Sequence, residues 1–127
     1  MKNCFKIFTF EVSPYWQANF SFKKQSKSEH HRLGEDSIEN IIINSVVPML
    51  VAYSQEKGEA EYFDRALSFL QQIKPETNSI IAQWQSLGLK PISALDSQGL
   101  IEQMNSFCKK RNCLNCSVGA TILKPVV

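Results

Sequence analysis

The sequence predicts a mainly α fold, an antiparallel bundle of about four to five helices with a short N-terminal strand. Three observations predict this class. Apolar residues recur at helical spacing after residue 34, and capping residues with glycine or proline separate these stretches. A length of 127 residues, 43% hydrophobic and 20% charged, is typical of one globular domain. We therefore expect a single domain, with a strand and polar loop over residues 1–33 and a helical core with a cysteine-containing turn over residues 34–127.

The N-terminal part begins with residues 5–12, where aromatic and β-branched residues alternate with polar ones and predict a short strand. Ser13 and Pro14 resemble a cap followed by proline at the first helical position, so a helix of one or two turns should start there. We expect its aromatic side chains to turn inward: Tyr15, Trp16 and Phe20. Residues 21–34 are polar and basic without periodicity, and we expect a loop.

The central helix should begin at Asp36, because an Asp-x-x-Glu pattern with Glu39 can cap free backbone N–H groups. The apolar stretch over residues 38–53 is shorter than the roughly 20 residues of a membrane-spanning helix. We interpret it as a buried helix, and we expect the protein to lie in the cytoplasm. Ile42 and Val46 should lie in the core.

Asn40, Asn44 and Pro48 fall four residues apart, so they share one stripe of this helix, and Pro48 cannot donate to the Asn44 carbonyl. A kink near Asn44 is expected. The stripe has two interpretations. It is either a buried polar strip that lines a ligand site, or a pair of amides that hydrogen-bond neighbouring backbone and fix the packing of the helix.

Further helices are predicted over residues 59–73, 79–87 and 93–108, with a short one over residues 118–123. Asn78 should cap the second, and Ser93 with Asp96 should form a capping box for the third. Gly88 should end a helix in the left-handed conformation. Gly99 within a helix suggests close packing at that point, because glycine costs about 1 kcal/mol relative to alanine there.

Charge is arranged in blocks within a net charge of +2: residues 1–33 carry +4, residues 34–104 carry −6 and residues 105–127 carry +4. The basic ends could meet nucleic acid, an anionic partner or the acidic middle of the chain itself. The basic run Lys109, Lys110 and Arg111 is short and lacks interleaved aromatic residues, so we expect no nucleic-acid contact.

Several motifs together resemble the C-terminal region of an uncharacterised bacterial family, a domain of unknown function. They are Ser13-Pro14-Tyr15-Trp16, the Asn-Ile-Ile-Ile-Asn run with Pro48, the Asn78 to Gly88 segment and the Cys-x4-Cys-x2-Cys motif. Members of that family are several times longer than this chain. The resemblance therefore implies that the chain corresponds to their last part, and it implies no activity, substrate or cofactor.

The main chemical signal is the cysteine motif of Cys108, Cys113 and Cys116. Two residues between Cys113 and Cys116 allow one turn to aim both sulfurs at one ion, and the neighbouring basic residues favour thiolates. Zinc or an iron–sulfur cluster usually takes four ligands, so a fourth would come from elsewhere: Cys4, His30 or His31. The same cysteines could instead be reduced structural thiols or an oxidised pair.

The sequence contains no recognisable arrangement of catalytic residues. No serine has a glycine elbow, no glycine-rich phosphate loop occurs, and paired carboxylates fall at predicted helix starts. We expect the chain not to be an enzyme. Two functional hypotheses remain: a helical interaction or structural domain, and a cysteine-ligated zinc or iron–sulfur module with possible nucleic-acid contact. For the first, we expect self-association or a protein partner through the N-terminal forty residues, and no membrane.

Overall fold

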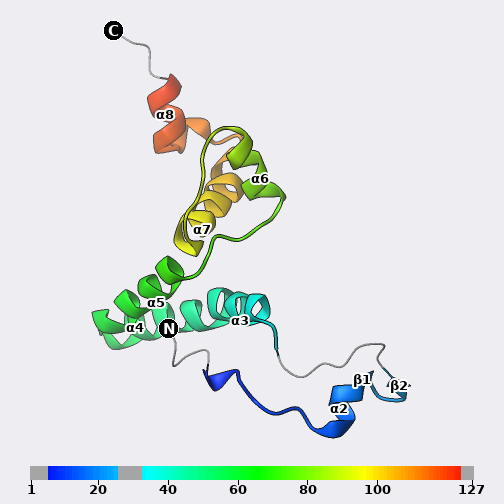
Figure 1. Cartoon of the computed structure of the whole chain (residues 1–127). Coiled ribbons are helices and arrows are strands. Elements are labelled where there is room, and N and C mark those ends of the chain that lie inside the picture. Colours follow the sequence, from blue (N-terminus) through cyan, green and yellow to red (C-terminus); the bar gives the residue numbers. More distant parts are fainter. Residues whose placement is uncertain (1–5, 26–32, 124–127) are drawn as a thin grey trace. The chain divides into compact units, whose positions relative to one another are not determined.

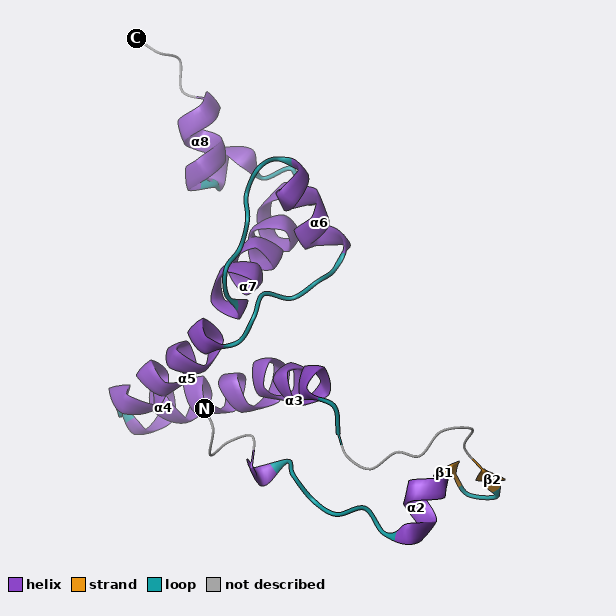
Figure 2. Ribbon diagram, viewed as in Figure 1, coloured by secondary structure: helices purple, strands orange, loops and turns teal. Residues whose placement is uncertain are grey.

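The computed structural model describes residues 6–25 and 33–123, which belong to two compact units, residues 1–69 and 70–127 (Figure 1). Helices dominate both units, and the described strands form one small hairpin (Figure 2). The mainly α class is confirmed. The single domain expected from length stays a prediction.

The N-terminal segment places its strand differently from the prediction. Residue 5 lies outside the described residues, residues 6 and 7 form a helical turn, and residues 9–13 form neither helix nor strand. The short strands are instead β1 (Asn19–Ser21) and β2 (Lys24–Gln25), an antiparallel pair in the region expected to be a loop. Alternation of apolar residues did not suffice to form a strand where the described residues offer no partner strand.

Helix α2 (Pro14–Ala18) starts as predicted, with Ser13 at the N-cap and Pro14 at the first helical position. The fixed φ of proline suits that position, and its missing N–H would have no intrahelical partner there in any case. The Asn19 amide donates to the Tyr15 carbonyl at 2.7 Å, where the chain leaves the helix for β1.

The central helix runs from α3 (Glu35–Ile41) through a π-helical turn, η1 (Ile42–Val46), into α4 (Val47–Lys57). It begins one residue before Asp36 with Gly34 at the N-cap, and no side chain caps it, so the predicted Asp36 cap is wrong. The π turn stands where the sequence predicts a kink. The Val47 N–H donates to the Ile42 carbonyl, five residues back, just before Pro48.

Buried side chains of the first unit gather mainly on this helix: Ile38, Ile42, Ile43, Val47 and Ser54 are buried there, with Ala66 from α5 (Ala60–Gln72). Ile42 is 0% exposed, as expected, whereas Val46 is only half-buried. Over 23 residues, Glu35–Lys57 is long and apolar enough to cross a membrane by length and composition. A core helix with buried isoleucines meets the same criterion.

Gly58 separates α4 from α5, because its φ of 71° is a left-handed conformation that glycine adopts without strain. Its N–H and the N–H of Glu59 both donate to the Ser54 carbonyl, at 2.9 and 3.2 Å. The Ser54 hydroxyl donates to the Glu59 carbonyl at 2.8 Å. These bonds satisfy the Ser54 carbonyl in the last turn of α4 and begin the turn into α5.

In the second unit, α6 (Ser79–Ser86) packs on α7 (Ala94–Gln103), and both begin with the predicted caps. The Asn78 side chain accepts the Ile81 N–H at 3.0 Å. Ser93 and Asp96 form the capping box. Gly88 has a φ of 88° after α6, as predicted.

Two hydrogen bonds hold α7 to α6 and to the loop that precedes α6. The Trp84 indole N–H donates to the Leu100 carbonyl at 3.0 Å. Ser97, 0% exposed, accepts the Glu76 N–H at 3.1 Å and donates to the Ala94 carbonyl. Gly99 is exposed with no atom within 4 Å of a Cβ position, so the predicted close packing there is wrong.

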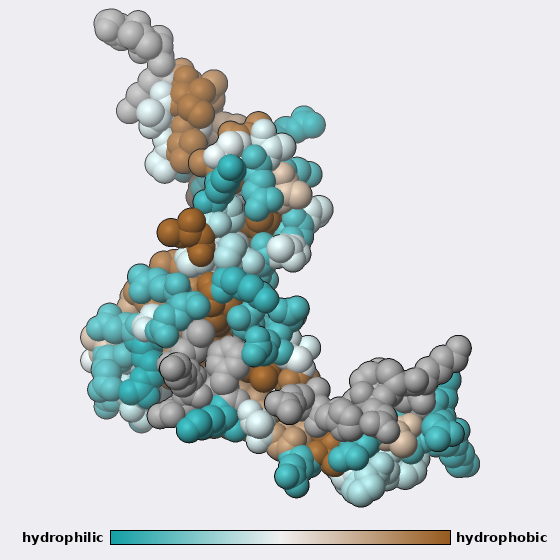
Figure 3. Space-filling view, viewed as in Figure 1, coloured by the Kyte–Doolittle hydropathy of each residue, from teal (hydrophilic) through white to brown (hydrophobic). Residues whose placement is uncertain are grey.

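After α7 the chain continues through a second π turn, η2 (Met104–Cys108), a 3-10 turn, η3 (Cys113–Asn115), and α8 (Ser117–Leu123). The short last helix is confirmed. Exposed apolar side chains on α8 include Val118, Ile122 and Leu123, and they appear as the brown surface over this helix in Figure 3.

Candidate functional site

Three aromatic rings contact one another in the N-terminal segment. Helix α2 supplies Tyr15 and Trp16, and the turn of the β1–β2 hairpin supplies Phe22. Ring centroids lie 5.0 Å apart for Tyr15 with Trp16 and for Trp16 with Phe22, both edge to face, and 6.4 Å apart for Tyr15 with Phe22. We call these three residues the aromatic cluster.

The aromatic cluster is exposed to solvent, contrary to the predicted inward orientation. Tyr15 is 46% exposed, Trp16 37% and Phe22 78%. The side chain of Phe20 lies outside the described residues. The cluster satisfies its own ring contacts without a core to cover it, because α2 and a two-stranded hairpin are too small to bury three rings. Lys23 and Lys24, both exposed, lie beside it in the hairpin, which gives the cluster a basic edge.

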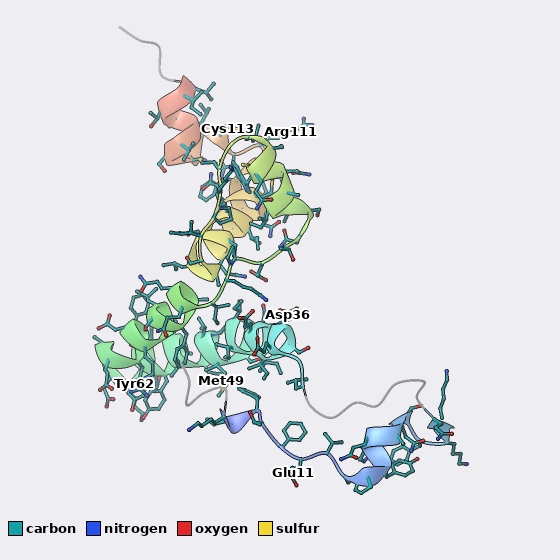
Figure 4. The ribbon with its side chains drawn as sticks, viewed as in Figure 1. Glu11, Asp36, Met49, Tyr62, Arg111 and Cys113 are labelled. Carbon is teal, nitrogen blue, oxygen red and sulfur yellow. The ribbon has the colours of Figure 1, made fainter. Side chains whose placement is uncertain are left out.

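A second exposed surface lies on α4 and α5, where Figure 4 labels Met49 and Tyr62. Met49 is 72% exposed, Tyr53 45% and Phe63 42%. Tyr53 and Tyr62 stack edge to face with centroids 4.7 Å apart, and the Arg65 guanidinium lies 5.8 Å from the Tyr62 ring centre. Exposed carboxylates belong to the same helices and the turn between them: Glu56, Glu59, Glu61 and Asp64.

The asparagine stripe is exposed rather than buried, so the interpretation as a buried polar strip is wrong. The Asn44 amide donates to both the backbone carbonyl and the side-chain oxygen of Asn40. An open hollow of about 370 Å³ is lined by Ser37, Asn40, Ile41, Asn44 and Ser45. Local hydrogen bonds along the helix thus account for the Asn44 amide, as the structural interpretation expects, whereas the packing role that it gives to the two asparagines stays a prediction.

The three cysteines of the motif differ in their exposure to solvent. Cys108, at the end of η2, and Cys113, at the start of η3, are exposed, whereas Cys116 is only 6% exposed. Cys113 and Arg111 are labelled in Figure 4 beside the start of α8. The Cys116 N–H donates to the Cys113 carbonyl at 3.3 Å, which closes the turn between them.

Cys116 is the residue before α8, and its sulfur accepts hydrogen bonds. The Gly119 N–H lies 3.4 Å from the Cys116 Sγ, and the Gln103 side-chain amide lies 2.8 Å from it. The Gly119 N–H is the main cause of a pKa below the ordinary value for the Cys116 thiol, and the Gln103 amide acts in the same direction against the effect of burial. Both donors favour the thiolate.

The metal hypothesis for Cys108, Cys113 and Cys116 stays a prediction. Among residues 6–25 and 33–123, no three histidine, cysteine, aspartate or glutamate side chains gather where they could hold a metal ion. The three further ligands considered from the sequence, Cys4, His30 and His31, lie outside those residues.

The sequence does not predict the roles of two residues at the cysteine turn, Gln103 and Gly119. Gln103 is 13 residues from Cys116, and no local pattern indicates that its amide reaches the sulfur. Gly119 packs against Cys113, where a Cβ would stand 2.5 Å from the carbonyl oxygen. The one sequence signal for this close approach of α8 to the Cys113 backbone is the presence of glycine near the start of a predicted helix.

Residues 1–79 match the model of a family described as "Protein of unknown function (DUF2851)". No curated protein and no solved structure matches the chain. The matched residues include the aromatic cluster, the asparagine stripe and α4, while the cysteine turn lies beyond them. Since the match covers more than half of the sequence, the chain belongs to the DUF2851 family.

Proposed function

We propose that this chain is a non-catalytic interaction domain that associates with a second copy of itself through the aromatic cluster. The observation that carries the proposal is the exposure of three rings that contact one another. Tyrosine and tryptophan are enriched at the energetic centres of protein interfaces, because each removes a large apolar area from water at a low cost in conformational entropy.

The proposal does not depend on a strand over residues 5–12. The aromatic cluster offers apolar area of its own, and two further exposed apolar side chains precede it in the same segment, Ile7 at 77% and Phe10 at 57%. Exposed apolar groups concentrated in one short segment are typical of interaction surfaces rather than of an isolated monomer.

Charge favours a second copy as the partner. The aromatic cluster has a basic edge at Lys23 and Lys24, while α4, α5 and the turn between them carry four exposed carboxylates against two exposed basic residues, Lys57 and Arg65. The N-terminal segment of one copy therefore complements the α4–α5 surface of another in both apolar character and charge. Such complementarity steers association and weakens as salt screens it.

Sedimentation velocity at micromolar concentration tests the proposal. We expect concentration-dependent dimerisation at low salt that weakens at high salt. Phe22→Lys, at a side chain 78% exposed, should shift the protein toward monomer while circular dichroism stays unchanged. Leu114→Lys is the matched control, because Leu114 is 80% exposed but lies in the other unit, and it should leave dimerisation unaltered.

A wild-type protein that remains monomeric over the whole concentration range would overturn self-association. Equal weakening by Phe22→Lys and Leu114→Lys would overturn the role of the aromatic cluster. Glu56→Lys near the end of α4 provides the complementary test, since reversal of this exposed charge should weaken dimerisation if the α4–α5 surface of the second copy contacts the aromatic cluster.

A second candidate function is a cysteine-ligated zinc or iron–sulfur module. It is favoured by one observation, the N–H donors that Gln103 and Gly119 direct at the Cys116 sulfur, because such donors also accompany metal-bound thiolates. Elemental analysis of protein purified under reducing conditions without chelator should then return about one zinc per chain or the iron of one cluster. Substoichiometric metal with freely titratable thiols would remove this candidate.

A further inference from the structure

We propose that Cys113 and Cys116 form a dithiol that exchanges reversibly with anionic low-molecular-weight disulfides, of which glutathione disulfide is the test case. The inference is independent of self-association. It rests on the backbone of the turn between the two cysteines, on their different exposure, and on the residues that hold the turn in place.

The backbone of the turn brings the two cysteines to disulfide range. Cys113 opens the 3-10 turn η3, and the Cys116 N–H donates to the Cys113 carbonyl three residues back. Side chains three residues apart in a 3-10 turn eclipse one another, and the Cα atoms across such a turn lie within about 7 Å. Disulfides join Cα atoms about 4.4–6.8 Å apart, so the bridge requires little backbone movement.

Exposure assigns a different role to each sulfur. Cys113 is exposed and can be reached by a disulfide from solution. Cys116 is 6% exposed, so it is shielded from the same reagent but lies on the same turn as Cys113. This is the arrangement of an entry cysteine followed by a resolving cysteine.

The turn is held on both sides. A Cβ on Gly119 would stand 2.5 Å from the Cys113 carbonyl oxygen, so α8 packs directly on the backbone of the entry cysteine. The Gln103 amide, from α7, reaches the Cys116 sulfur at 2.8 Å. Because both residues are positioned before any reaction, little entropy is lost when the bridge closes.

The basic run before the turn favours an anionic partner. Lys109, Lys110 and Arg111 are all exposed, and no acidic residue follows residue 104 in the sequence. Glutathione disulfide carries several carboxylates, so its local concentration at this positive patch should rise. This charge distinguishes it from a small cationic disulfide such as cystamine.

The exchange balances in two steps. The Cys113 thiolate attacks one sulfur of glutathione disulfide, so a mixed disulfide forms and one glutathione thiolate leaves. The Cys116 thiolate then attacks the Cys113 sulfur, the internal bridge forms, and the second glutathione thiolate leaves. The two cysteine protons end on the two glutathiones, so the dithiol is oxidised by two electrons and one glutathione disulfide is reduced.

The test equilibrates the full chain in glutathione buffers of increasing disulfide content, followed by acid quenching, alkylation and tryptic mass mapping. Cleavage after Lys109, Lys110 and Arg111 separates Cys108 from the pair. We expect the peptide that starts at Asn112 to lose two hydrogen atoms and become resistant to alkylation, reversibly on addition of reduced glutathione. A pair that stays fully alkylatable in glutathione disulfide alone, or a bridge from Cys113 to Cys108, overturns the proposal.

Three variants assign the roles. Cys116→Ser keeps an oxygen at the cap position of α8, and it should accumulate a stable glutathione adduct on Cys113. Cys113→Ser should prevent both the adduct and the bridge on this peptide, whereas Cys108→Ser should behave as wild type. An adduct on Cys116 in the Cys113→Ser variant at the wild-type rate would overturn the assignment of Cys113 as the entry cysteine.

A parallel reaction with cystamine tests the preference for an anionic disulfide. The intrinsic reactivities of the two disulfides differ, so the measured quantity is the ratio of the glutathione disulfide rate to the cystamine rate at each salt concentration. We expect this ratio to fall several-fold from low to high salt. A ratio that does not change with salt, or that rises, would overturn the anionic preference.

Discussion

Gly119 lies so close to Cys113 that a Cβ atom on it would stand 2.5 Å from the Cys113 carbonyl oxygen and 3.1 Å from the adjoining carbonyl carbon. These neighbours are backbone atoms, which cannot swing aside as the end of a long side chain can. The N-terminal turn of α8 thus depends on the absence of a side chain at this one position. The contact connects the entry cysteine to the helix that the Cys116 sulfur caps.

Gly119→Ala should therefore destabilise the C-terminal unit, by about 1–3 kcal/mol in the free energy of unfolding, because the added methyl forces the backbone apart. Chemical denaturation followed by circular dichroism measures this. Gly99→Ala is the matched control, since Gly99 is a helical glycine with nothing within 4 Å of its Cβ position. That control should stabilise the protein by about 0.5–1 kcal/mol. Equal effects at the two glycines would contradict the packing described for Gly119.

Ile42→Ala should cost about 2–5 kcal/mol, because Ile42 is 0% exposed and its truncation leaves a cavity in a close-packed core. Met49→Ala on the same helix serves as the comparison, and a side chain 72% exposed should change stability by less than about 0.5 kcal/mol. The measurement is the shift in the denaturation midpoint of each variant. An Ile42→Ala midpoint equal to that of wild type would show that the helix is peripheral.

Ser97→Ala should destabilise the second unit by about 1–3 kcal/mol, because it leaves the Glu76 N–H without the hydroxyl that accepts it at 3.1 Å. The buried hydroxyl also donates to the Ala94 carbonyl, so both bonds of Ser97 are lost together. Native-state hydrogen exchange locates the effect, and the Glu76 amide should exchange faster. Ser86→Ala, at an exposed hydroxyl that bonds only within its own helix, should have little effect.

Asp96 links stability to pH. The Ile92 N–H is the main cause of a pKa below the ordinary value for this carboxyl, and the Ser93 hydroxyl and N–H lower it further. A carboxyl with a lowered folded pKa adds stability that is fully present above its unfolded pKa, near 3.9, and is lost as pH falls through the folded pKa.

Asp96→Asn should therefore be less stable than wild type at neutral pH, and the difference should shrink as pH falls through the folded pKa. Urea denaturation at a series of pH values between neutral and strongly acidic measures it. A difference that stays constant over this range would show that the charge of Asp96 does not contribute.

Much of the fold follows from signals within a few residues. Asn78 accepts an N–H three residues ahead, and Ser93 and Asp96 exchange hydrogen bonds across the same spacing. Gly58 and Gly88 end helices because the left-handed conformation costs glycine little. Interactions of this range involve only neighbouring residues, so the sequence alone indicates the caps at Asn78 and Ser93 and the glycine end at Gly88. A pattern of the same range failed at Asp36, where the helix begins one residue earlier with Gly34 at its N-cap.

Other features depended on partners far along the chain or on their absence. Residues 9–13 alternate like a strand but form none, and the rings of Tyr15 and Trp16 meet one another rather than a core. A local pattern specifies which face of a segment is apolar, yet it does not specify whether another element covers that face. The sequence therefore did not predict the exposed aromatic cluster, although it indicated Tyr15 and Trp16 as aromatic residues of a short helix.

The cysteine turn combines a feature that follows from local spacing with one that depends on contacts between distant residues. The spacing of Cys113 and Cys116 is enough to predict that one turn can hold both sulfurs, because two residues separate them. Their different exposure follows from packing, which buries Cys116 beside the Gln103 amide and leaves Cys113 exposed. The physical reason is distance along the chain: burial and sulfur hydrogen bonding arise where α7 meets the start of α8, and residues 13 apart meet only once the helices have packed.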